Sequence, residues 1–259
     1  MASVKLQENE VFSNLRIPED SEFFIRLDGR RFSRLCKLLD AEKPFDVRIA
    51  RCFVQAARAV YSSGFNPSLC YLCSDEVNLL FQPPPPFNGR VEKLDSVLAS
   101  IISSGFSLAV NEIFGKKTVA PFDSRVIVTP AELIFEYLAW RQRELNGNYL
   151  NAYGYWTLIR EGLDPKSAAK QLEGLDSAQI AKLITKHEVD LSKKPIWQRK
   201  GMLLYRKTAA VKYLTGVGKI TRSRLEEDWT PPDFASRNGR AAVRRIFSQY
   251  KTGKRCAEE

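Results

Sequence analysis

The chain of 259 residues contains 44% apolar and 27% charged residues, a composition that is ordinary for a folded protein and excludes a disordered or low-complexity chain. Its length is sufficient for one large domain, or two moderate ones, with a full hydrophobic core. The net charge of +10 is concentrated in residues 193–256, where 17 Lys and Arg residues stand against 4 acidic residues.

Residues 1–130 show a pattern of alternating strands and helices. The predicted elements are a strand at 22–27, helices at 31–40 and 46–62, strands at 69–73 and 77–81, a helix at 91–114 and a strand at 125–128. With the first two helices counted as one crossover, this is the βαββαβ order of the ferredoxin-like fold. Nucleotide-polymerase palm domains and nucleotide cyclases share this order, which by itself does not fix a function.

After residue 130 the pattern becomes mainly helical and then basic. Helices are predicted at 132–145, 151–161, 165–172 and 177–187, followed by a strand-rich segment at 202–213 and a basic amphipathic helix at 239–251. The expected fold class is therefore α+β, with a ferredoxin-like polymerase palm and a mainly helical, basic C-terminal region. We expect one domain at residues 1–130 and a second region at residues 131–259.

The placement of the charge predicts a polyanionic partner, most simply nucleic acid. Because the last quarter of the chain also carries apolar and aromatic residues, we expect it to fold rather than to form a solvated tail. The first ten residues are polar and the longest uncharged run, 96–111, is too short to cross a bilayer, so we expect no membrane partner. Five cysteines, an odd number, favour reduced thiols and a cytoplasmic location.

Several kinds of catalysis find little support in the composition. The single histidine, His187, lies in a Lys-rich helical stretch, so Ser-His-Asp and Cys-His chemistry are nearly excluded. Cys70 and Cys73 have the spacing of half a zinc site, but no second cysteine pair exists, and a buried structural pair is expected. Carboxylates acting with a metal ion remain.

Two carboxylates mark the ends of apolar, strand-like runs. Asp28 is followed by Gly29, and Ser74-Asp75-Glu76 separates two apolar runs as in a hairpin turn. In the βαββαβ topology the first strand and the strand after the hairpin are neighbours, so Asp28 and Asp75 would meet at one edge of the sheet. Carboxylates on rigid strand ends are what two magnesium ions need for phosphoryl transfer.

A set of short motifs resembles the tRNA-His guanylyltransferase family over about residues 5–207. The resemblance implies a 3′–5′ nucleotidyltransferase that activates the 5′ end of tRNA with a nucleoside triphosphate and then adds nucleotides there. The motifs are Arg26-Leu27-Asp28-Gly29-Arg30-Arg31-Phe32, Glu42-Lys43-Pro44-Phe45-Asp46, Ser74-Asp75-Glu76, Gly89-Arg90 with Lys93, Pro121-Phe122-Asp123-Ser124-Arg125-Val126, Trp140-Arg141-Gln142 with Trp156, and Arg199-Lys200-Gly201.

Residue by residue, the resemblance implies a complete site. Asp28, Gly29 and Asp75 would hold two Mg²⁺ ions, with Asp28, Asp75 and Glu76 as the catalytic carboxylates, and ATP or GTP would be the activating nucleotide. Family members work as dimers or tetramers, so a homodimer or homotetramer is expected. The implied nucleotide contacts are Arg26, Arg30, Arg31, Phe32, Lys43, Asp46, Ser74, Arg90, Lys93 and Asn146.

Basic residues would supply the grip on tRNA. Contacts with phosphates position an RNA without reading its sequence, and such binding weakens steeply with salt. The aromatic side chains Trp197, Tyr205 and Trp229 could stack on bases, although packing is the expected role. The candidates for phosphate contact are Arg125, Arg199, Lys200, Arg206, Lys207, Arg222, Arg224, Arg244 and Arg245.

Two positions depart from the family pattern. Asn146 stands where the family's guanylyltransferases carry a histidine tied to activation and tRNA-His selection, and Ser33 stands where another histidine is frequent. In these two positions the chain resembles the guanylyltransferase-like branch of archaea and bacteria. Members of that branch repair truncated tRNA 5′ ends by copying the opposite strand of the acceptor stem. The alternatives are strict guanylyl addition to tRNA-His and, more distantly, a nucleotide cyclase or a non-catalytic RNA-binding protein.

Overall fold

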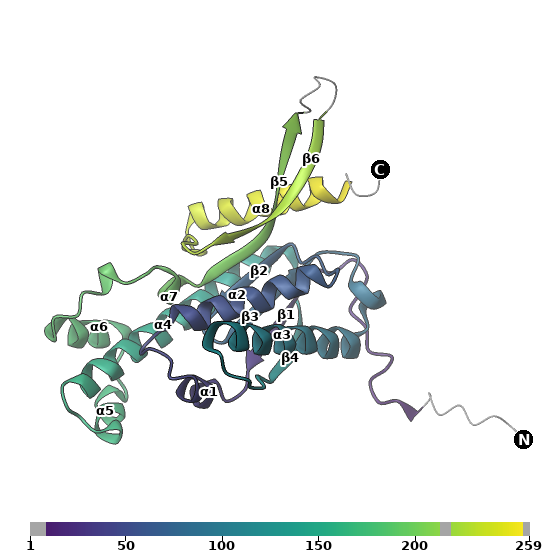
Figure 1. Ribbon diagram of the computed structural model, residues 1–259. Coiled ribbons are helices and arrows are strands. Elements are labelled where there is room, and N and C mark those ends of the chain that lie inside the picture. Colours follow the sequence, from purple (N-terminus) through teal and green to yellow (C-terminus); the bar gives the residue numbers. More distant parts are fainter. Residues whose placement is uncertain (1–8, 213–218, 256–259) are drawn as a thin grey trace, which may run out of the picture.

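The computed structural model describes residues 9–212 and 219–255, which form a mixed α+β fold (Figure 1). The strands are β1 (Phe23–Gly29), β2 (Leu69–Cys73), β3 (Glu76–Phe81), β4 (Phe122–Val128), β5 (Met202–Lys212) and β6 (Lys219–Asp228). The helices are α1 (Phe32–Leu38), α2 (Val47–Ser62), α3 (Val91–Phe114), α4 (Ile134–Arg160), α5 (Pro165–Leu172), α6 (Ser177–Lys186), α7 (Trp197–Lys200) and α8 (Arg237–Arg255).

All six strands belong to one antiparallel sheet in the order β4-β1-β3-β2-β5-β6. The expected βαββαβ order of the first half is confirmed, since β1 lies between β3 and β4. The second half of the chain extends this same sheet through β5, which pairs with β2. The β5–β6 hairpin projects away from the body of the molecule (Figure 1).

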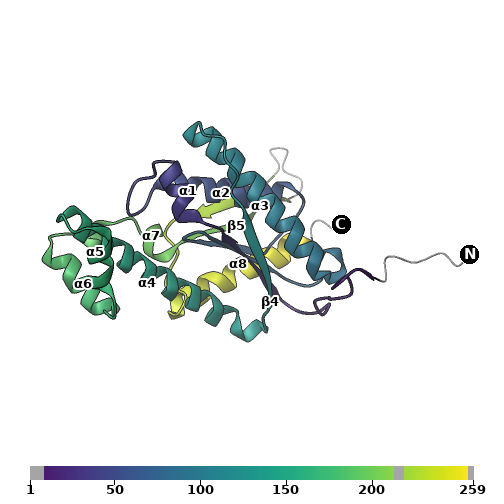
Figure 2. The same cartoon turned by 90° about the horizontal axis from the view of Figure 1, so that it is seen from below.

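Helices cover both faces of the sheet (Figure 2). On one face, α2 and α3 pack on alternate strand residues such as Ile25, Leu27 and Leu79, and form the main hydrophobic core. On the other face, α4 and α8 cover the intervening residues, among them Phe24 and Leu80. This two-sided burial explains why β1 and β3 read as nearly continuous apolar runs.

The long helix α3 is apolar enough, by length and composition, to cross a membrane, but such a signal is equally given by the core helix of a folded protein. Its residues Leu94, Leu98, Ile102, Phe106 and Val110 recur every four positions and are buried. This stripe packs against α2 and the sheet, so the apolar character of α3 is explained by the core.

Two expectations about the second half need correction. The helices predicted at 132–145 and 151–161 are one continuous helix, α4, although Asn146-Gly147-Asn148 are weak helix formers. Buried residues on both sides of this stretch, such as Leu145 and Tyr149, anchor the helix through it. The strand β6 was not predicted, because its mainly polar sequence, basic in the first part and acidic at the end, gives no apolar pattern. Tyr213, in the predicted strand segment, lies outside the described residues.

Candidate active site at the edge of the sheet

Direct strand pairing aligns three carboxylates across the sheet. Asp28 on β1 is paired with Glu76 on β3 and with Asp123 on β4, so the three side chains lie on one face in a single row. The next row on the same face contains Arg26 and, opposite it, Arg125. Two neighbouring strands therefore present an acidic row and a basic row side by side.

The turn between β2 and β3 brings Asp75 to this acidic row. The N–H of Gly29 donates to the carbonyl oxygen of Asp75 at 3.0 Å, which ties the end of β1 to the turn. Ser74 adopts a positive φ of 56° in the turn and leaves Asp75 partly buried. Burial and then the charge of Asp28 raise the pKa of Asp75, while a hydrogen bond from Ser74 opposes that shift. Asp28 and Asp75 thus meet, as the sequence predicted.

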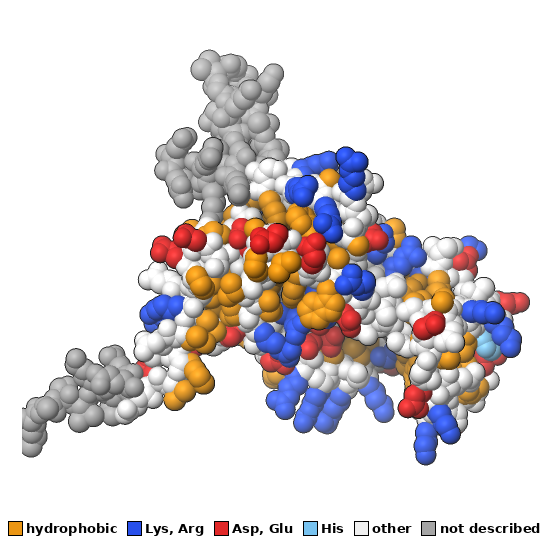
Figure 3. Space-filling view, turned by 180° about the vertical axis from the view of Figure 1, so that it is seen from behind, with side chains coloured by type: hydrophobic (Ala, Val, Ile, Leu, Met, Phe, Trp, Pro, Cys, Tyr) orange, Lys and Arg blue, Asp and Glu red, His pale blue; other side chains and the backbone are white. Residues whose placement is uncertain are grey.

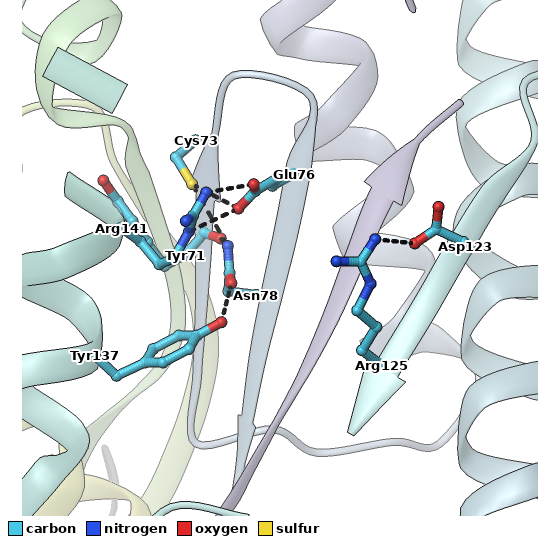
Figure 4. Close-up of polar contacts among 8 residues, drawn as sticks. All are labelled: Tyr71, Cys73, Glu76, Asn78, Asp123, Arg125, Tyr137 and Arg141. Carbon is cyan, nitrogen blue, oxygen red and sulfur yellow. Dashed lines mark hydrogen bonds and ion pairs between the residues drawn. The ribbon is translucent and has the colours of Figure 1, made fainter. Parts of the chain in front are cut away.

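Glu76 has a different environment from Asp28. The Arg141 guanidinium donates to both carboxylate oxygens of Glu76, through Nε to Oε2 at 3.0 Å and through a terminal nitrogen to Oε1. The two side chains are only 11% and 14% exposed, so this is a largely buried bidentate ion pair (Figure 4). Glu76 therefore has its negative charge compensated within the protein.

Asp123 is also paired, because Arg125 donates to its Oδ1 at 3.1 Å on the exposed face of β4 (Figure 4). Among the residues that the structure describes, no cationic side chain lies within ion-pair distance of Asp28 or Asp75. The two carboxylates at the turn are the uncompensated members of the acidic group.

A buried polar network supports the turn from behind. Asn78 is fully buried on β3; its Oδ1 accepts a hydrogen bond from the Tyr137 hydroxyl at 2.6 Å. Its Nδ2 donates to the Tyr71 carbonyl at 3.4 Å and to the Cys73 sulfur at 3.5 Å, so it links β2 to β3 (Figure 4). Sequence reasoning missed this network, and it named Arg141 only as part of a motif without assigning it a role. A lone Asn in the apolar run of β3 was the available signal, because a buried amide requires partners.

The loop before α2 brings two further predicted residues near the turn. Asp46 caps α2: it accepts hydrogen bonds from the backbone N–H groups of Glu42 and Arg48 and from the Arg48 guanidinium. Burial opposes ionisation, but these hydrogen bonds lower the pKa of Asp46. The thiol of Cys36 is within electrostatic reach of Lys43, Asp75 and Asp46, and burial raises its pKa. Lys43 and Asp46 therefore lie on the same side of the molecule as Asp75.

The arginines of the first motif lie around the strand end. Arg26 faces the Trp140 ring at 6.0 Å, and its buried Nε has no hydrogen-bond partner among the described residues. Arg30 and Arg31 are exposed, with Arg31 at a φ of 59° at the start of α1. Phe32 points inward, where its ring packs with those of Phe53, Phe106 and Phe122. Its predicted nucleotide contact would require that ring to leave an aromatic core.

The end of the sheet that carries Asp28 and Asp75 is referred to as the acidic edge. Within one chain, the structure does not bring Arg90 and Lys93 to this edge. They stand at the start of α3, which follows the far end of β3, whereas Asp28 is paired with the first residue of that strand. Arg90 forms an ion pair with Glu92 at 3.1 Å, and Lys93 faces the Phe87 ring at 5.4 Å.

Asn146 lies on α4 at a cavity of about 510 Å³. The cavity is bordered by α4, by Ser177 at the start of α6, by Arg199 and Lys200 of α7, and by Asp233 before α8. The buried Nε of Arg199 has no hydrogen-bond partner among the described residues. Asn146, Arg199 and Lys200 therefore share one polar, mainly basic hollow.

The other candidates for tRNA contact are distributed along the C-terminal half. Arg206 donates to the Asn66 side chain at 3.0 Å, and Arg224 and Lys207 both approach Glu226. On α8, Arg244 covers the Phe135 ring at 5.3 Å, and Arg245 is exposed. The side chain of Arg222 lies outside the described residues. Trp197 and Trp229 pack edge-to-face at 6.0 Å beside the main core, which favours the packing role for both.

The acidic edge fits a hard divalent cation. Asp28, Asp75 and the Gly29 carbonyl form an oxygen-only donor set, which suits Mg²⁺ rather than zinc. Burial and then the like charge of Asp28 raise the pKa of Asp75, and a bound cation would relieve the repulsion between the two carboxylates. Within residues 9–212 and 219–255 no cluster of three His, Cys, Asp or Glu side chains forms a metal cage, so water or phosphate oxygens would have to complete the coordination.

Comparison with known proteins places this geometry in context. The family model "tRNAHis guanylyltransferase" matches residues 2–130, and the model "Thg1 C terminal domain" matches residues 132–243. A probable tRNA(His) guanylyltransferase of Drosophila melanogaster is 32% identical over 189 residues, which cover 71% of this chain and 66% of the relative. The Schizosaccharomyces pombe tRNA(His) guanylyltransferase is 31% identical over 183 residues, which cover 69% of this chain and 68% of the relative.

Two solved structures share the fold. A bacterial tRNA(His) guanylyltransferase (Thg1)-like protein in complex with ATP superimposes with a TM-score of 0.75 at 23% identity, covering 93% of this chain and 96% of that chain. The Saccharomyces cerevisiae tRNA(His) guanylyltransferase superimposes with a TM-score of 0.69 at 23% identity, covering 77% and 91%.

The antiparallel sheet, with its uncompensated carboxylates at one edge and these matches along the chain, defines a nucleotidyltransferase. The chain belongs to the tRNAHis guanylyltransferase (Thg1) family.

Proposed function

We propose that this protein is a template-dependent 3′–5′ nucleotidyltransferase that activates and extends the 5′ end of truncated tRNAs. The observation that carries the chemistry is the pair of uncompensated carboxylates, Asp28 and Asp75, joined at the edge of the sheet by the Gly29–Asp75 hydrogen bond of 3.0 Å. The family supplies the substrate class, since its members are guanylyltransferases of tRNA.

Asp28, Asp75 and the Gly29 carbonyl are the proposed ligands of two Mg²⁺ ions, which would supply the Lewis-acid chemistry of phosphoryl transfer. Lys43, on the same side as Asp75, would bind the phosphates of the activating ATP or GTP. Glu76 stays paired with Arg141 and would hold the turn that carries Asp75, so its contribution would be positioning. Arg26 lies in the row next to Asp28 with its guanidinium at the Trp140 ring, and its positive charge would attract the nucleotide or the RNA.

Repair of 5′ ends, rather than strict guanylyl addition to tRNA-His, is favoured by Asn146. This position is exposed on α4 at the cavity with Arg199 and Lys200, and an amide cannot carry the charge or act as the acid-base group that the family's histidine can. A site without that histidine would not depend on its contact with one tRNA. We propose residues 1–130 as the catalytic unit and residues 131–259 as the RNA-binding unit, acting in the cytoplasm as a homodimer or homotetramer.

The test offers purified protein a tRNA that lacks its first nucleotide, with ATP, all four nucleoside triphosphates and Mg²⁺. We expect wild type to restore the missing nucleotide, and Asp28→Asn and Asp75→Asn to lower the rate by about 1,000-fold or more, equivalent to about 4 kcal/mol of activation free energy. The matched control is Asp95→Asn, a half-buried carboxylate on α3 that bonds Ser124 on the opposite face of the sheet. Failure of wild type to extend any tRNA would refute the proposal.

The rival activity is distinguished by the choice of substrate. Truncated tRNA-His and a second truncated tRNA are compared under the same conditions. Similar kcat/KM values for the two support repair. Exclusive use of tRNA-His, with guanosine added beyond the first base pair, supports strict guanylyltransferase activity instead.

A further inference from the structure

Positive charge without a carboxylate partner gathers beside the acidic edge, and of the residues that supply it the sequence predicted only Arg30 and Arg31 at the site. Six exposed basic side chains lie there and are referred to as the basic end patch: Arg30, Arg31, Arg34, Lys37, Lys116 and Lys117. Within the described part of the chain, no carboxylate lies within 4.0 Å of any of their charged nitrogens. Lys and Arg side chains gather in the region of α1, at the lower edge of the face shown in Figure 3.

The fold assembles this patch from two segments. Arg30 and Arg31 follow Gly29 directly, and Arg34 and Lys37 continue along the outer face of α1, whose inner face is buried. Lys116 and Lys117 come from the connection between α3 and β4, which reaches the same end of the molecule (Figure 2). The Lys116 ammonium donates to the Leu38 carbonyl at 2.7 Å, and this bond fastens the connection to α1.

Several of the C-terminal basic residues are engaged internally. Arg206 bonds Asn66 at 3.0 Å, Arg224 pairs with Glu226 at 3.1 Å, and Arg240 pairs with Glu136 at 3.3 Å. A cation already paired with a carboxylate gains less from a phosphate, because the existing pair must be broken. The basic end patch therefore offers unpaired cations in the first half of the chain, where the charge distribution of the sequence shows no excess of basic residues.

We propose that the basic end patch is a docking surface for the phosphate backbone of the RNA whose 5′ end enters the acidic edge. This inference rests on the proposed function and names a contact surface for its substrate. Helical side chains three positions apart are about 5–6 Å from each other, so Arg34 and Lys37 lie together on α1, and Arg30 and Arg31 directly precede that helix. A group of cations without carboxylate partners can bind the phosphates of an RNA without reading its bases. The same charges would steer the RNA toward the acidic edge.

The experiment measures binding of a fluorescent 5′-truncated tRNA by anisotropy between about 50 and 300 mM KCl. The patch variant is Arg34→Gln, Lys37→Gln, Lys116→Gln and Lys117→Gln, which leaves the proposed nucleotide contacts Arg30 and Arg31 in place. The control variant is Lys166→Gln, Lys170→Gln, Lys182→Gln and Lys186→Gln, which removes the same charge from exposed positions on α5 and α6 that are not among the candidate phosphate contacts of the RNA-binding unit.

We expect the patch variant to flatten the slope of log K against log salt concentration by about 3, at about 0.7–0.9 per phosphate contact. Its affinity should fall by 10-fold or more at the lowest salt, and its KM for tRNA should rise while its KM for ATP stays within about 2-fold. A charge-conserving variant, Arg34→Lys with Lys37→Arg, should bind like wild type. Circular dichroism and thermal melting establish that each variant is folded.

Two outcomes would overturn the inference: a patch variant that is folded and keeps the wild-type slope and affinity, or a control variant that loses as much as the patch variant. Loss of binding to phosphatidylserine vesicles with unchanged tRNA binding would likewise assign the patch to another partner. These results are separate from the proposed function, which fails only if wild type does not extend tRNA.

Discussion

Asp28 on β1 and Glu76 on β3 face each other as a directly paired couple, yet only Glu76 has a guanidinium partner. The difference follows from α4, which passes over β3 and places Arg141 against Glu76. Asp28 is beyond the ion-pair reach of described cations, and its nearest charged neighbour in the turn, Asp75, has the same sign. Two directly paired carboxylates on one sheet therefore differ: Glu76 is held in an ion pair, whereas Asp28 has no cationic partner among the described residues.

The Asp28–Asp75 repulsion predicts that Asp75→Asn stabilises the fold. A raised pKa means that folded Asp75 binds its proton more tightly than unfolded Asp75 does, so wild-type stability falls as pH rises from the ordinary Asp value through the raised one. At pH 7 the variant lacks this penalty, and we expect its Tm to exceed that of wild type by a few °C, the size that about 1 kcal/mol produces in a chain of this length.

Thermal melting at pH 4 to 8 measures the effect. The gain should shrink as the pH falls toward the ordinary pKa of Asp, because wild-type Asp75 is then protonated. Added Mg²⁺ should raise the Tm of wild type more than that of the variant, since ligand binding to the native state adds stability. An Asp75→Asn variant that melts below wild type at pH 7 would contradict the repulsion.

The buried Glu76–Arg141 pair predicts a strong non-additive effect on stability. Glu76→Gln or Arg141→Gln alone leaves a largely buried charge without its partner and should cost about 3 kcal/mol of unfolding free energy. The double variant should recover at least about 1 kcal/mol of the summed loss. Urea unfolding of the four proteins gives the coupling energy, and strictly additive losses would show that the pair is not coupled.

Removal of a single hydroxyl tests the network behind the turn. Tyr137→Phe deletes the 2.6 Å hydrogen bond to Asn78 and leaves a fully buried amide oxygen without that donor, for an expected loss of about 1–2 kcal/mol. Tyr155→Phe is the control, because that partly buried ring packs on Trp156 with no hydrogen bond described for its hydroxyl. Equal free energies of unfolding in urea for the two variants would show that the Asn78–Tyr137 hydrogen bond does not stabilise the fold.

Gly29 predicts a steric effect separate from any metal contact. A Cβ added there would collide with the Phe32 ring, which is held among Phe53, Phe106 and Phe122, so Gly29→Ala should cost about 1–3 kcal/mol. Gly147→Ala is the matched control: it lies within α4 with open space around the new Cβ and should be stabilising by up to about 1 kcal/mol. An unchanged Tm for Gly29→Ala would mean that the Phe32 ring can move away from the new methyl group at little cost.

Much of the first half of the fold followed from local pattern. The apolar runs of β1 and β3, the turn at Ser74-Asp75 and the Asp46 cap of α2 were predictable, because each is encoded within a few neighbouring residues. The meeting of Asp28 with Asp75 followed from the βαββαβ order, which leaves few topologies. The continuity of α4 through Gly147 did not follow from the sequence. Leu145 is buried against the sheet and Tyr149 is buried against α6, and this burial outweighs local helix propensity.

The sequence by itself therefore determined which residue types carry the chemistry: the two carboxylates at strand ends, a chain with a single histidine, and a strongly basic last quarter. Only the tertiary structure decided which charges are free. It paired Glu76 with Arg141 and several C-terminal cations with acids. Among the described residues it left Asp28, Asp75 and the basic end patch without an oppositely charged partner at ion-pair distance. The physical reason is that a charge is compensated by whichever opposite charge the fold brings within a few ångströms. For Glu76 that partner is Arg141, which lies 65 residues further along the chain.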